Sequence, residues 1–194
     1  MRFLKWAGLV SAFLVVAVLT AVGYVRSTGL RARATPGALE TRVARTMRSL
    51  AISSRDRARA NPVTASEEAL QSGLEHYADH CAVCHGNDGR GLTDFGRGLF
   101  PPPPDLRAPP TQELTDGELF YVIENGIRFT GMPAFSTGTP DGEAESWKLV
   151  HFIRRLPQVG EADLERMKAL NPRSPAEIRL ELEEERFLRG EGPP

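Results

Sequence analysis

The distribution of apolar and polar positions along the chain predicts a protein built mainly from helices. Residues 6–25 form an apolar run that contains no charged side chain. A helix of about 20 residues spans about 30 Å, the thickness of the hydrocarbon core of a bilayer. Residues 1–26 are therefore predicted to be either a membrane anchor or a cleaved secretory signal. The length of the apolar run favours an anchor, because the apolar core of a signal is usually shorter.

Residues 27–62 have the composition of a basic connector. Within it, four apolar residues recur at helical spacing: Leu39, Val43, Met47 and Leu50. Arginines lie between them, so the pattern predicts a short amphipathic helix near the membrane. Two interpretations stay open, a solvated stalk and a helix that contacts lipid headgroups or a partner.

A folded unit is predicted over residues 63–160, with three helices that start at polar capping residues. These residues are Thr64 with Glu67, Thr115 with Glu118, and Asp141. The apolar positions after each cap follow the period of a helix, and no alternating strand pattern of useful length occurs. Residues 161–194 are predicted to be a helical extension with pieces at about 161–170 and 174–189.

The segment 86–110 differs from its surroundings, because it is rich in glycine and contains six prolines between positions 101 and 110. Proline fixes φ and lacks an amide hydrogen, so neither a helix nor a central strand is expected there. A long irregular segment is unusual in a small domain. It suggests that the chain wraps around a group that is not protein.

Charge is distributed unevenly, although the formal net charge of the 194 residues is only −1. Residues 1–62 carry 11 Lys and Arg against two acids, and residues 63–194 carry 13 against 23. An acidic folded unit repels phosphate, so a nucleic-acid partner is not expected. The two cysteines are too few for a disulfide scaffold or a four-thiolate zinc site.

Both cysteines lie in the sequence Cys81-Ala82-Val83-Cys84-His85, the C-x-x-C-H pattern of c-type haem attachment. Two thiols at this spacing can form thioethers to the two vinyl groups of one porphyrin, and the next imidazole can bind the iron. A dithiol redox motif would lie beside a βαβ pattern, a zinc site would need more ligands, and a disulfide across three residues would be strained. One covalent haem c is therefore expected, with Cys81 and Cys84 as attachment sites and His85 as an iron ligand.

The sixth iron ligand is predicted to be Met132. The other candidates are Met47, Met167, His76, His80 and His151. Met132 differs from these because it lies in a loop between Gly131 and Pro133, where close backbone approach and an extended chain are favoured. Ligation by histidine and methionine raises the potential and leaves no vacant position, which favours electron transfer over catalysis.

The segments CAVCHG, PPPPDL, GIRFTGMPAF and SWKLVHFIRRL resemble a class I monohaem cytochrome c, similar to the oxidase-subunit-like cytochrome c domains of bacteria. The resemblance covers about residues 66–157. It implies an all-α fold wrapped round one covalent haem, with His85 and Met132 as axial ligands. It also implies that the first helix crosses the last, and that a carbonyl of Pro101–Pro104 accepts the ring proton of His85. The residues expected to meet at the crossing are Gly73, Tyr77, Leu149 and Phe152. Weaker candidates for contact with haem propionates are Arg97, Arg107, Arg128 and Trp147.

The function expected from these observations is single-electron transfer in a respiratory chain, without enzymatic activity of its own. Redox proteins or a membrane respiratory complex would be its partners, and the N-terminal helix would hold it in the bilayer. One alternative is the haem subunit of a membrane oxidase, reductase or dehydrogenase, and another is a haem sensor or peroxidase in which Met132 is displaced. Positive charges after the apolar run favour a cytoplasmic domain. Haem attachment outside the cytoplasm outweighs them, so the predicted location is the bacterial inner membrane with the haem domain facing the periplasm.

Overall fold

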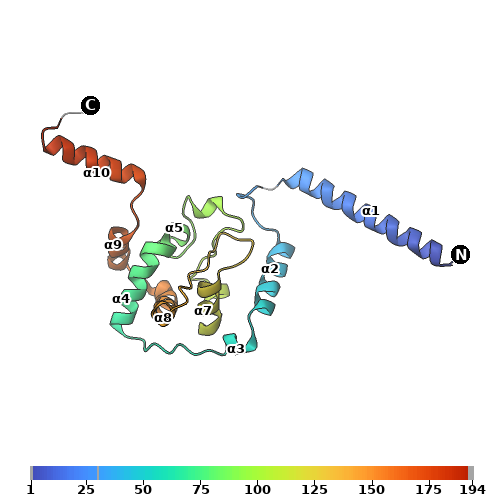
Figure 1. The fold of residues 1–194 in the computed structure, drawn as a ribbon, viewed down its shortest axis with the longest axis horizontal. Coiled ribbons are helices and arrows are strands. Elements are labelled where there is room, and N and C mark those ends of the chain that lie inside the picture. The colour runs from blue at the N-terminus through green and yellow to red at the C-terminus, as the bar shows by residue number, and fades with distance from the viewer. Residues whose placement is uncertain (1, 30, 192–194) are drawn as a thin grey trace.

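The computed structural model describes residues 2–29 and 31–191, and within them the regular elements are helices, with no strand (Figure 1). The α-helices are α1 (Arg2–Thr28), α2 (Ala38–Ala51), α3 (Ser54–Arg57), α4 (Glu67–His76), α5 (Ala82–His85), α6 (Pro109–Gln112), α7 (Asp116–Asn125), α8 (Pro140–Arg155), α9 (Glu161–Leu170) and α10 (Pro175–Leu188). The short elements are the π-helix η1 (Tyr77–Cys81) and the 3-10 helices η2 (Gly96–Gly98) and η3 (Leu156–Gln158). The predicted all-α fold class is confirmed.

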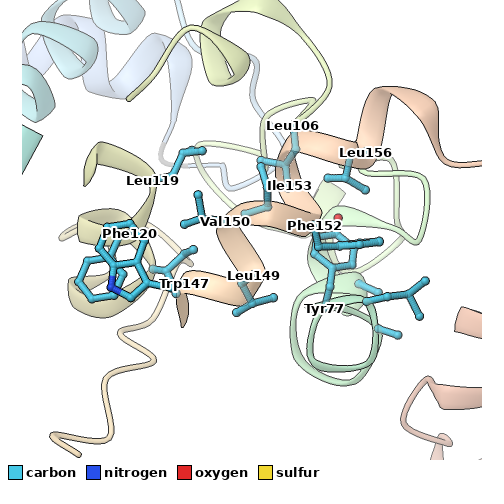
Figure 2. Close-up of a cluster of buried hydrophobic side chains, with 14 of the residues drawn as sticks. Tyr77, Leu106, Leu119, Phe120, Trp147, Leu149, Val150, Phe152, Ile153 and Leu156 are labelled. Carbon is cyan, nitrogen blue, oxygen red and sulfur yellow. The ribbon is translucent and has the colours of Figure 1, made fainter. Parts of the chain in front are cut away.

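The core forms where α4 and η1 cross α8, and α7 packs on the other side of α8 (Figure 2). The ring centroids of Tyr77 and Phe152 are 5.2 Å apart at the first contact. At the second, Trp147 stacks on Phe120 with ring centroids 4.0 Å apart. The predicted crossing of the first and last helices of the domain is present, with Leu149 and Phe152 fully buried between them.

Two of the predicted helix starts are wrong by two residues. The side chain that caps α4 is Ser66, whose hydroxyl accepts a hydrogen bond from the Ala69 amide at 3.1 Å, and not that of Thr64. Helix α8 is capped by Thr139 instead of Asp141, because Pro140 has a φ suited to the first helical position. The predicted capping box of Thr115 and Glu118 is present at the start of α7.

Residues 52–63 pack against α7 and α8, and we call this segment the strap. The backbone of Asp56 lies so close to Gly117 that an added Cβ on this glycine would be 2.0 Å from the Asp56 carbonyl oxygen. The guanidinium of Arg59 lies 4.3 Å from the centre of the Phe120 ring. The sequence analysis did not predict this packing, which joins the end of the basic connector to the helical core.

Helices α1 and α10 extend away from the helical body (Figure 1). Residues Lys5–Ser27 of α1 are long and apolar enough to cross a membrane, and a signal sequence near an N-terminus has the same properties. The C-terminal helices occur where the sequence predicted them. Helix α9 buries Met167 completely, and α10 starts at a capping box of Ser174 and Glu177.

Candidate haem-attachment site

A π-helical turn carries the chain from α4 into the cysteine motif. The wider turn η1 ends at Cys81, and α5 then carries Cys84 and His85. Single π-turns inserted in helices are frequent at functional sites. Here the turn brings the two thiols and the imidazole to the end of the helix that crosses α8. The three side chains that the motif predicted therefore lie within about one turn of each other.

Cys81 and Cys84 form no disulfide, and both side chains are half-buried. Burial, with a smaller contribution from Cys84, raises the pKa of Cys81 to about 12. Burial also raises the pKa of Cys84. Because the thiolate is the form that binds metal ions, neither sulfur is prepared for thiolate ligation at neutral pH. A thioether carries no charge and fits these surroundings better.

The imidazole of His85 lies beside the proline-rich segment. Burial lowers the pKa of His85, and a contact with the Pro104 backbone opposes this effect. The ring nitrogen Nδ1 is buried and forms no hydrogen bond of standard geometry, so the contact with Pro104 is loose. Of the four prolines in Pro101–Pro104, Pro104 is the one whose backbone raises the pKa of His85.

Short hydrogen bonds fasten the glycine-rich segment to the cysteine motif. The amide of Gly91 donates to the His85 carbonyl at 2.7 Å, and the hydroxyl of Thr93 donates to the Val83 carbonyl at 2.8 Å. Gly91 has a φ of +72°, and an added Cβ would lie 2.4 Å from the carbonyl oxygen of Pro103. Only glycine fits this position, which brings the proline segment close to His85.

The loop that carries Met132 is closed by its own backbone. The Ile127 amide donates to the Met132 carbonyl at 3.1 Å, and the Met132 amide donates to the Thr130 hydroxyl at the same distance. Within this loop, Phe129 has a φ of +63° and an exposed fraction of 92%. The loop conformation is thus defined by its hydrogen bonds, and the role of Met132 as an iron ligand stays a prediction.

The other candidate ligands have different surroundings. Met167 is fully buried in the core and Met47 is exposed on α2. The Nε2 atom of His151 lies 2.8 Å from the carbonyl oxygen of Val63. The rings of His76 and His80 contact each other at 4.9 Å between centroids, before the cysteines. Among the residues that the structure describes, no group of three or more His, Cys, Asp or Glu is placed to hold a metal ion.

The weaker candidates for propionate contacts lie on different elements. Trp147 is buried in the core and its indole N–H has no hydrogen-bond partner. Arg97 pairs with Asp94 at 3.5 Å, and the Nε atom of Arg107 lies 3.7 Å from an oxygen of Asp105. Arg128 is exposed in the Met132 loop. Their contact with haem propionates stays a prediction.

Residues Cys81, Cys84 and His85 fit a covalently attached haem. They supply two neutral thiols and an imidazole whose Nδ1 atom is buried without a hydrogen-bond partner, beside a proline segment that approaches closely at Gly91. A feature that the sequence analysis missed supports the same site. The hydroxyl of Tyr77 donates a hydrogen bond to the carbonyl of Gly86 at 3.0 Å, which ties the residue after the motif to the core.

Part of this chain is similar to known proteins. Residues 68–153 match the family described as cytochrome c oxidase, cbb3-type, subunit III. A quinohemoprotein alcohol dehydrogenase, ADH IIB of Pseudomonas putida, is 32% identical over 94 residues, which cover 48% of this chain and 12% of that protein. A solved structure from a reducing HAO-like protein complex of Kuenenia stuttgartiensis is similar with a TM-score of 0.43 and 23% identity, covering 49% of this chain and 46% of that one. The predicted resemblance is confirmed: residues 68–153 form a cytochrome c domain of the cbb3-type oxidase subunit III family.

Proposed function

We propose that this protein is a membrane-anchored carrier of single electrons that uses one haem c with His85 and Met132 as axial ligands. The observation that carries the proposal is the C-x-x-C-H motif at the end of a helix inside a cytochrome c domain. The bound haem supplies the redox chemistry, because its iron alternates between Fe(II) and Fe(III). The protein has no enzymatic activity of its own in this proposal.

The residues of the chain hold and orient the group. Cys81 and Cys84 attach it, and His85 binds from the proximal side. The Pro104 carbonyl beside the His85 ring orients the imidazole, as outer partners of ligating histidines usually do. Met132 would bind from the distal side, and it lies in a loop closed by its hydrogen bonds with Ile127 and Thr130. With both axial positions filled, oxygen and small substrates find no open coordination site.

Helix α1 is proposed to remain as a single-pass anchor in the bacterial inner membrane, with the haem domain on the periplasmic side. Its apolar span from Lys5 to Ser27 is 23 residues long, which exceeds the usual length of a signal core. Attachment of haem to the two thiols takes place outside the cytoplasm, which supports the same orientation. Electron donors and acceptors would then be redox proteins or complexes of that membrane.

A second candidate function is that of a haem subunit in a membrane oxidase, reductase or dehydrogenase. The matching family is described by a subunit of an oxidase, and the Pseudomonas putida relative is a dehydrogenase of which the match covers 12%. Helix α10 exposes Leu180, Phe187 and Leu188, which offers an apolar surface for docking in such a complex. Purification in mild detergent separates the two candidates, because a stable stoichiometric complex favours the subunit.

The proposal is tested on matured full-length protein by a pyridine haemochrome spectrum together with intact mass. One haem is expected to remain bound after denaturation, and the mass is expected to include residues 1–26. The double variant Cys81→Ala with Cys84→Ala should hold no haem through acid acetone extraction. Absence of porphyrin from the matured protein would contradict the proposal. Rapid binding of carbon monoxide to the reduced protein would instead favour a sensor or peroxidase.

A further inference from the structure

Helix α2 carries an apolar stripe that no part of the described chain covers. The stripe consists of Leu39, Val43, Met47 and Leu50, which recur every three or four residues along one face. Their exposed fractions are 75%, 53%, 61% and 75%. No residue of α2 is buried, so the helix does not contribute to the core.

The opposite face of α2 is the one that turns toward the haem domain. Thr41 and Arg48 are two turns apart and are its half-buried positions. Partial burial lowers the pKa of Arg48, and Glu118 of α7 opposes this effect through its charge. The neighbouring Ser49 accepts a hydrogen bond at its carbonyl from Arg57 of the strap at 2.8 Å. The apolar stripe therefore points away from the domain.

The charge around the stripe suits an anionic surface. Residues 26–51 contain six arginines and one glutamate, which gives a formal charge of +5. Arg42 and Arg45 lie on the exposed part of α2, and Arg31 and Arg33 precede it. An apolar face beside arginines, on a helix of low overall hydrophobicity, is typical of helices that lie in the interface of a membrane.

The position of α2 in the chain brings it close to a membrane. Helix α1 ends at Thr28 and α2 begins at Ala38, so nine residues join them. Nine residues reach about 30 Å when fully extended. If α1 spans a bilayer, α2 cannot leave the vicinity of its surface, whereas a protein partner would have to be present in addition.

We propose that α2 lies flat on the bilayer that holds α1, with its apolar stripe inserted beside the headgroups of anionic phospholipids. The proposal rests on α1 being a retained anchor. Leu39, Val43 and Met47 would enter the boundary between headgroups and acyl chains. Arg42, which lies beside the stripe, would reach the phosphates while its aliphatic stem stays near the apolar face.

The test uses spin labels in the haem-loaded full-length protein, whose own cysteines are consumed by the haem. Labels are placed at Val43→Cys and Met47→Cys on the stripe and at Ala44→Cys, which lies about 100° round the helix from Val43. A fourth label, Val16→Cys, reports on α1. The proteins are reconstituted in vesicles of mixed phosphatidylcholine and phosphatidylglycerol, and collisions with oxygen and with a water-soluble nickel complex are compared.

The ratio of oxygen to nickel collisions is expected to be several-fold higher at Val43→Cys and Met47→Cys than at Ala44→Cys. In vesicles of phosphatidylcholine alone, the ratio at the stripe should fall, because the attraction to anionic headgroups is removed. An unchanged ratio there would contradict the choice of anionic lipid. Stripe labels exposed to water, with Val16→Cys in lipid, would overturn this inference and leave the anchor intact. Stripe labels shielded from both reagents would show a protein partner and overturn it as well. A water-exposed label at Val16→Cys would instead overturn the anchor on which the inference rests.

Discussion

Gly73 of α4 lies directly against the backbone of Lys148 in α8. An added Cβ would be 2.5 Å from the Lys148 carbonyl oxygen and 3.0 Å from the Cβ atom of Phe152. Neither atom belongs to a flexible side chain end, so the helices would have to move apart. We expect Gly73→Ala to lower the free energy of unfolding by about 1 to 3 kcal/mol, although alanine is the better helix former. Denaturant unfolding followed by circular dichroism measures this change.

The matched control is Gly98→Ala. Gly98 ends the short helix η2, and nothing lies within 4 Å of its added Cβ. This variant should unfold within about 0.5 kcal/mol of the original protein, as surface substitutions usually do. Equal stability of the two variants would show that α4 and α8 do not cross at Gly73.

Replacement of Met132 tests the distal ligand. Met132→Ala should keep the covalent haem but lose the sulfur–iron absorption band near the red end of the spectrum. The potential should fall, because methionine ligation favours the reduced iron. The change is expected to stay within the roughly 0.8 V over which axial ligands tune haem potentials. Visible spectra and a redox titration of the purified variant give both results.

The other methionines provide controls of different burial. Met47→Ala removes an exposed side chain on α2 and Met167→Ala removes a fully buried one in the core. Met167→Ala should destabilise the fold by about 2 to 5 kcal/mol and leave the band in place. If the band survives in Met132→Ala and disappears in either control, Met132 is not the ligand.

The buried hydroxyl of Tyr77 predicts a loss of stability in alkali. Burial is the largest cause that raises the pKa of Tyr77 well above its usual value of 10.0, and the negative charges of neighbouring groups add to it. Above pH 10 the unfolded chain therefore releases the proton that the folded chain keeps. Unfolding becomes more favourable as the pH rises from there. The contribution of the Tyr77 hydroxyl to the free energy of unfolding is fully present only below pH 10.

The variant Tyr77→Phe isolates this effect. It removes the hydrogen bond to Gly86, which should cost about 0.5 to 1.5 kcal/mol at pH 7. The difference between the two proteins should shrink as the pH rises above about 10. Unfolding curves measured at several alkaline pH values test the trend, and a difference that stays constant would argue against the buried hydroxyl as its source.

The strap is tested by Gly117→Ala. The added Cβ would lie 2.0 Å from the Asp56 carbonyl oxygen and 3.0 Å from those of Arg57 and Arg59. The strap should therefore detach from α7, at a cost of about 1 to 3 kcal/mol. Trypsin should then cleave faster after Arg57 and Arg59. The same substitution at Gly160, where nothing lies within 4 Å of an added Cβ, should not change the cleavage rate.

The sequence predicted those parts of the fold that depend on neighbouring residues. The capping box of Thr115 and Glu118 and the helices α9 and α10 are local patterns, and each occurs where it was expected. The caps of α4 and α8 were misassigned. At α4, Thr64 and Ser66 both have hydroxyls near the start of the helix, and at α8 both Thr139 and Asp141 have side chains that can cap. Sequence spacing alone does not show which hydroxyl reaches a free amide.

Features that depend on distant residues were harder to predict. The strap packs against Gly117, and the Pro104 backbone lies near His85, because of how loops fold back in space. No periodicity in the chain encodes either contact. The sequence did contain one signal for the strap, which is Gly117 in the first turn of α7. Glycine is unfavourable in a helix, so its presence there indicates that another backbone comes close.

The packing of the strap limits how far an anchored haem domain can travel. Residues 52–63 belong to the helical body, so the linker between α1 and the domain is at most residues 29–51. Helix α2 makes up most of this linker. If α1 stays in the membrane, as proposed, a short tether confines the domain to a thin layer above the lipid, where its local concentration for other proteins of the same membrane is high. Electron exchange with such neighbours then becomes a two-dimensional search, and a soluble partner has to enter that layer to compete.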